Sequence, residues 1–66
     1  MQIQVNGEPL ELADNATISA LVTQMVLEGQ RYAIEVNEEI VSRSHHDTYC
    51  LSDGDQIEVV QAIGGG

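Results

Sequence analysis

The sequence predicts an α+β fold, a mixed sheet of four to five short strands with one main helix across one face. Apolar and polar residues alternate in the first and last thirds of the chain, which is typical of strands with one buried face. Between them, apolar residues recur at helical spacing. The 66 residues allow one domain and no second one.

Residues 2–12 are expected to form a β-hairpin. Ile3 and Val5 alternate with glutamines, and Asn6-Gly7 then supplies a strong signal for a type I′ turn, which needs positive φ at both central residues. Pro9 lacks an N–H donor, so the second strand of the hairpin is expected at an edge of the sheet.

One amphipathic helix is expected after Asp14. Thr17 or Asn15 can cap its N-terminus, and Gly29 fits the left-handed residue that follows a helix. A helix this short is unstable alone in water and must pack on a sheet. Its apolar stripe consists of Ile18, Leu21, Val22, Met25 and Val26.

The second half of the chain returns to strand patterns. Residues 32–37 alternate, residues 40–41 form a short apolar segment, residues 42–48 are expected to be a surface loop, and Asp53-Gly54-Asp55 is a tight turn. The last strand, Ile57–Ala62, is apolar on both faces, which predicts a central position.

Because a helix separates the first strand from the last, these two strands are expected to pair in parallel. This is a β-grasp arrangement. It divides the chain into a β-grasp domain over residues 1–63 and a flexible C-terminal glycine tail over residues 64–66.

The composition excludes several classes of partner. Eleven acidic and two basic side chains give a formal charge of −9, and Arg31 and Arg43 cannot supply the phosphate-neutralising patch of a nucleic-acid-binding protein. The same deficit argues against anionic membranes, and no apolar run is long enough to span a bilayer. No secretory signal is recognised, and the single Cys50 cannot form an internal disulfide, so the expected location is cytoplasmic.

No catalytic residue or metal site is predicted. A chain of this size has no room for a deep substrate pocket. Cys50 is expected to be a small half-buried hydrophobe at the start of a short strand. His45, His46, Asp47 and Cys50 resemble a ligand cluster, but adjacent histidines point in different directions and no second pair of ligands exists, so solvated loop histidines are expected. Asp53-Gly54-Asp55 lacks the spacing of a calcium loop.

The glycine terminus allows two interpretations. It can be a disordered end, or the chain end can itself be the reactive group, since a glycine tail can thread a narrow channel in another protein. The acidic side chains are most simply solvated, although they could also form a docking surface for a basic partner: Glu8, Glu11, Glu35, Glu38, Glu39 and Glu58.

The chain resembles the sulfur carrier proteins of thiamine thiazole biosynthesis, a ubiquitin-like β-grasp family. The resemblance extends over essentially the whole chain and maps the terminal Gly-Gly of the family onto Gly65 and Gly66, with Gly64 at a variable position. It rests on Asn6-Gly7, Ala16-Thr17-Ile18, Leu21-Val22, Ala33-Ile34-Glu35-Val36-Asn37, Ile40-Val41 and, above all, Leu51-Ser52-Asp53-Gly54-Asp55-Gln56-Ile57-Glu58-Val59-Val60 before the glycines.

This resemblance implies a carrier cycle. An E1-like adenylating enzyme would adenylate the Gly66 carboxylate with its own ATP and Mg²⁺. A persulfide from a sulfur donor (a cysteine desulfurase or similar) would displace AMP, and the resulting thiocarboxylate would donate sulfur to thiazole synthase. The carrier would bind no cofactor and catalyse nothing, while Gly64 and Gly65 thread into the partner sites.

Val60 and Ala62 are expected on the sheet face away from the helix, as part of a partner-docking patch. Two alternatives remain open at this point. One is a different sulfur carrier: the sulfur-carrying small subunit of molybdopterin synthase, or a carrier for another sulfur product. The molybdopterin synthase subunits are typically longer than this chain. The other is a β-grasp interaction module without covalent chemistry.

Overall fold

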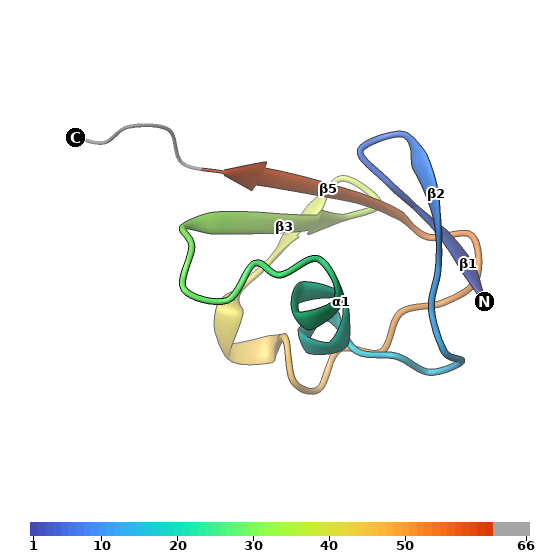
Figure 1. Ribbon diagram of the computed structural model, residues 1–66, viewed down its shortest axis with the longest axis horizontal. Coiled ribbons are helices and arrows are strands. Elements are labelled where there is room, and N and C mark those ends of the chain that lie inside the picture. Colours follow the sequence, from blue (N-terminus) through green and yellow to red (C-terminus); the bar gives the residue numbers. More distant parts are fainter. Residues whose placement is uncertain (62–66) are drawn as a thin grey trace.

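The computed structural model describes residues 1–61, which form five strands, one α-helix and one 3₁₀-helix (Figure 1). Ala62, the glycines at 64–66 and the predicted boundary after residue 63 lie outside the described residues. In chain order the elements are β1 (Gln2–Val5), β2 (Glu8–Glu11), α1 (Ile18–Gln24), β3 (Tyr32–Val36), β4 (Glu39–Val41), η1 (Arg43–His45) and β5 (Gln56–Gln61).

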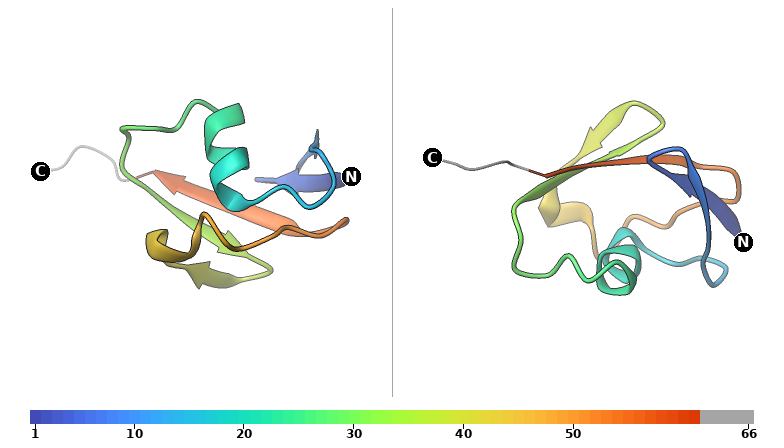
Figure 2. Two further views of the ribbon diagram at one scale, coloured as in Figure 1. Left: turned by 90° about the horizontal axis from the view of Figure 1, so that it is seen from below. Right: turned by 45° about the horizontal axis from the view of Figure 1, so that its top comes forward.

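The strands form one mixed sheet in the order β2-β1-β5-β3-β4, and α1 lies across one of its faces (Figures 1 and 2). β1 and β5 pair in parallel, while the other neighbours are antiparallel. The predicted β-grasp arrangement with a central last strand is therefore confirmed. Pro9 lies in the edge strand β2, as its missing N–H requires.

The hairpin turn also secures the central strand. Asn6 and Gly7 both have positive φ, 51° and 84°, as the predicted turn requires. The Asn6 side chain then accepts a hydrogen bond from the Val59 N–H at 2.8 Å. Because β1 ends at Val5, this side chain extends the bonding along β5 by one step.

The helix begins where the sequence predicts. Thr17 is the N-cap, and its Oγ1 accepts a hydrogen bond from the Ala20 N–H at 3.2 Å. This bond satisfies one of the N–H groups that the first turn leaves without a helical partner. Of the two candidate caps, the structure uses Thr17 and not Asn15.

The helix ends earlier than predicted, and two expectations about this end are wrong. Val26 has a φ of 58° and is 71% exposed, so it follows the helix instead of extending its buried stripe. The Val26 N–H donates to the Thr23 carbonyl and the Leu27 N–H to the Val22 carbonyl, the pattern of a Schellman motif. Val26 is thus the left-handed residue that directly follows the helix, whereas Gly29, whose φ of 82° is also positive, comes three residues later. Burial of Leu27 in the core explains why the chain turns here.

We expect Val26→Gly to stabilise the protein by about 1 kcal/mol, because a β-branched residue is strained at positive φ and this side chain buries little surface. Urea denaturation followed by circular dichroism measures the change. Val26→Ala, which keeps a Cβ at the same φ, is the control and should gain much less. Equal effects of the two substitutions would contradict the strain argument.

The core lies between α1 and the sheet. Every strand except the edge strands β2 and β4 contributes at least one buried residue, and Ile3, Ile18, Leu21 and Ile34 are completely buried. The remaining members are Val5, Leu12, Val22, Leu27, Val36, Leu51 and Ile57. In the described part of the chain, no helix is long and apolar enough to cross a membrane.

His46 is buried, contrary to the expectation of a solvated loop histidine. Its Nε2 lies 3.0 Å from the Val41 carbonyl oxygen, and its ring stacks on Tyr32 with centroids 6.1 Å apart. The Ser19 N–H donates to the His46 backbone carbonyl, which joins this segment to α1. His46 therefore belongs to the packed interior and lies next to Tyr32 at the start of β3.

Candidate functional site

The sheet face opposite α1 is solvent-facing and carries the candidate site. Residues directly opposite each other on paired strands share a face, so the register assigns to this open face Ala33, Glu35, Ile40, Glu58 and Val60. Val60 is 47% exposed and lies next to Ala33. The prediction that Val60 lies on the face away from the helix is confirmed, while Ala62 is outside the described residues.

Val60 stands close to the point where the described chain ends. β5 runs to Gln61 at one end of the sheet, and five more residues follow in the sequence (Figure 1). The predicted tail residues Gly64, Gly65 and Gly66 are among these five. Val60, on the open face, is thus only four residues before the predicted glycine tail.

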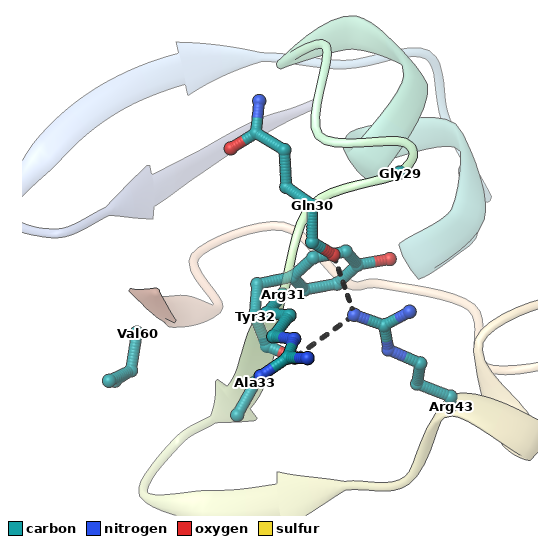
Figure 3. A pocket seen from close by; sticks show the side chains of 7 residues that line it. All are labelled: Gly29, Gln30, Arg31, Tyr32, Ala33, Arg43 and Val60. Atoms are coloured by element: carbon teal, nitrogen blue, oxygen red, sulfur yellow. Dashed lines mark hydrogen bonds between the residues drawn. The ribbon is translucent and has the colours of Figure 1, made fainter. Parts of the chain in front are cut away.

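An open groove of about 560 Å³ lies beside this end of β5 (Figure 3). The Arg43 guanidinium is held over the Tyr32 ring, with Cζ 4.1 Å from the centroid, and its Nη2 donates to the Gln30 carbonyl at 3.0 Å and more weakly to that of Tyr32. The groove is lined by Gly29, Gln30, Arg31, Tyr32, Ala33, Arg43 and Val60.

The acidic side chains are largely uncompensated. Glu35 and Glu58 are direct cross-strand neighbours on the open face, where like charges destabilise a sheet. Among residues 1–61, which contain every charged side chain of the chain, the ion pairs are those of the Met1 ammonium with Glu11 and Asp14. The groove arginines therefore stand in a strongly negative field.

The other sequence candidates do not assemble into a site. Cys50 is exposed, not half-buried, and forms only an isolated bridge to Thr17 instead of starting a strand. His45 is exposed beside Ser42, and His46 is enclosed in the core, so the two histidines point apart. No group of three or more potential ligand side chains capable of holding a metal ion occurs within residues 1–61.

Asp53-Gly54-Asp55 is a structural turn. Gly54 has a φ of +86°, and the Asp55 N–H donates to the Ser52 carbonyl. The carboxylates accept backbone hydrogen bonds, that of Asp53 from Gln2 and that of Asp55 from Ser52, each at 2.8 Å. The turn thereby aligns the start of β5 with β1.

Comparison with known proteins decides the family. The profile of the ThiS family matches residues 3–66, which is nearly the whole chain and includes the glycine end. The chain belongs to the ThiS family.

A solved ThiS-family structure has the same fold. The crystal structure of thiamine biosynthesis protein ThiS from Geobacter metallireducens matches with a TM-score of 0.81 and 28% sequence identity, over 100% of both chains. This agreement supports the β-grasp assignment.

Curated relatives of this ThiS-family chain are of two lengths. Sulfur carrier protein ThiS of Escherichia coli is 33% identical over 100% of both chains. Thiazole synthase of Paramagnetospirillum magneticum is 35% identical over all of this chain, but the chain spans only 20% of that relative's length. A ThiS-like segment thus occurs both alone and as one part of a longer thiazole synthase.

Sequence reasoning missed the groove of this ThiS-family chain. From the sequence, Arg31 and Arg43 showed only that the chain has few basic residues, and nothing predicted that they line the same groove. Their convergence depends on the chain reversal through β3 and β4, which places η1 next to the start of β3. The available signal was that the two basic residues flank this pair of short strands.

Proposed function

We propose that this chain is a sulfur carrier protein for thiamine thiazole biosynthesis. The observation that carries the proposal is the ThiS-family match, which continues through Gly65 and Gly66 beyond a complete β-grasp sheet. The fold supports the same role, because the described body ends in the central strand and the glycines follow it in the sequence after only two residues.

The reactive group is the C-terminal carboxylate of Gly66. A carboxylate is a poor electrophile, so an E1-like adenylating enzyme first joins it to AMP from ATP and releases pyrophosphate. The terminal sulfur of a persulfide donor, such as a cysteine desulfurase, then displaces AMP, and a thiol cleaves the S–S bond to leave the thiocarboxylate. Thiazole synthase accepts this sulfur, while Gly64 and Gly65 occupy the narrow approach to each partner site.

The chain itself is a carrier and not an enzyme. Its described cavities are open grooves, and its polar residues at the turns and caps are engaged in structural hydrogen bonds. ATP and Mg²⁺ belong to the adenylating partner. The exposed free thiol of Cys50 fits a reducing compartment, so the cytoplasm is the proposed location.

The experiment that tests the proposal is intact-mass analysis after incubation with ATP, the adenylating enzyme, and a sulfur donor. A carrier gains the mass difference between sulfur and oxygen. A β-grasp interaction module without covalent chemistry shows no gain, and the absence of a shift with cognate enzymes would overturn the proposal.

The open face is the proposed docking surface, with Val60 beside the tail and Ala62 following it. We expect Val60→Asp to weaken binding of the adenylating enzyme about tenfold, because the change places a charge in an apolar contact. Titration calorimetry measures the dissociation constant.

Val26→Asp is a matched control for this experiment. It makes the same Val-to-Asp exchange at an exposed position after α1, outside the strands of the open face, where the left-handed backbone suits Asp. It should leave the affinity unchanged. Equal affinities for the two variants would remove Val60 from the docking surface.

A further inference from the structure

The two basic side chains of the protein line the same groove. Arg31 precedes β3, and Arg43 begins η1, yet both border the cavity beside Val60 (Figure 3). All eleven acidic side chains lie within residues 1–61, and neither arginine lies within 4.0 Å of one of their carboxylates. The positive charge is therefore concentrated at one point and is not neutralised by the chain's own acids.

The two arginines have different roles in the groove. Arg43 is held in place by its stacking on Tyr32 and by its hydrogen bond to the Gln30 carbonyl, so it forms one side of the groove. Arg31 is exposed and is two residues from Ala33, which neighbours Val60 on the open face. A guanidinium in this setting suits a carboxylate, which it can bind with two parallel hydrogen bonds.

We propose that this arginine groove receives an Asp or Glu side chain of thiazole synthase when the glycine tail enters that enzyme. The inference rests on the proposed function and adds a specific contact to it. The carrier is acidic overall, and on its open face the Glu35–Glu58 pair repels an acidic group of a partner. The arginine groove attracts such a group, so the two features together favour one orientation of the partner. The contact would therefore orient the carrier as well as hold it.

Thiazole synthase is the chosen partner because a ThiS-like segment occurs within a longer thiazole synthase among the relatives. The occurrence of both in one chain favours a direct interaction between a ThiS-family protein and thiazole synthase. The groove lies at the end of β5 from which the tail continues, so a partner holding the tail reaches it without crossing the sheet.

The test is the affinity of the complete chain for thiazole synthase, measured by titration calorimetry at several salt concentrations. Arg31→Gln is expected to weaken binding about two- to tenfold and to reduce the dependence of affinity on salt. Arg31→Lys, which keeps the charge but loses the two parallel hydrogen bonds, should give an affinity between those of Arg31→Gln and the wild type. Arg31 is preferred to Arg43 as the test position because Arg43 also supports the fold through Tyr32.

Ala20→Glu is the matched control. It changes the net charge by the same amount at an exposed position in the first turn of α1, where Glu suits the helix N-terminus. Affinity equal to that of the wild type is expected. If Arg31→Gln and Ala20→Glu bind alike, the arginine groove is not a contact, although sulfur loading of Gly66 can still occur. A wild-type chain that does not bind thiazole synthase would overturn both proposals.

Discussion

Deletion of Gly66 should abolish sulfur loading completely, because the deletion moves the terminal carboxylate one residue short of the atom that the adenylating enzyme must reach. A peptide unit spans about 3.3 to 3.6 Å, and a displacement of this size prevents reaction in a geometrically constrained site. Intact-mass analysis should show the sulfur-for-oxygen gain in the wild type and none in the deletion variant. The thermal midpoint should not change, because the buried core lies within residues 3–57.

A second variant, Cys50→Ser, tests whether the exposed thiol of Cys50 is the sulfur acceptor. Cys50 could take up sulfur as a persulfide, which adds a whole sulfur atom and not the difference between sulfur and oxygen. Cys50→Ser should load like the wild type. Loading that survives deletion of Gly66 but is lost in Cys50→Ser would place the sulfur on the side chain and contradict the carrier mechanism.

Ile34→Ala should leave the protein largely unfolded at room temperature. Ile34 is completely buried at the centre of β3, and a buried Ile→Ala substitution costs about 2–5 kcal/mol. A core of this size supplies only about 3–5 kcal/mol of net stability. Circular dichroism in a urea titration should show a midpoint near zero denaturant.

Ile40→Ala is the matched control, because Ile40 lies on the neighbouring strand β4 but is 72% exposed. It should change stability by less than about 0.5 kcal/mol, as surface substitutions usually do. If the two substitutions have equal effects, the core does not lie on the helix side of the sheet, and the open-face assignment of Ile40 is also wrong.

The hairpin and the start of the helix could be predicted because their causes are local. Asn6-Gly7 accepts positive φ wherever it occurs, and the Thr17 side chain reaches an N–H only three residues away. The parallel pairing of β1 with β5 followed from element order, since a helix-containing connection leaves few compact alternatives.

The end of the helix and the exposure of single side chains could not be predicted in this way. The spacing of Val26 fits a buried stripe, but the chain turns left-handed there because Leu27 is the residue that enters the core. His46 and Cys50 also differ from their expected environments: His46 is buried and stacks on Tyr32, and Cys50 is exposed beside Thr17. Such choices depend on partners distant in the sequence.

The sequence by itself determined the α+β class, the central last strand, the family resemblance and the candidate reactive residue Gly66, since all of these are encoded in periodicity, turn residues and motif order. The tertiary structure confirmed the expected open-face position of Val60, and it alone decided that Arg31 and Arg43 border one groove. The physical reason is that strand pairing joins residues far apart in the chain. Charge can therefore be counted from the sequence, but where it is concentrated depends on the fold.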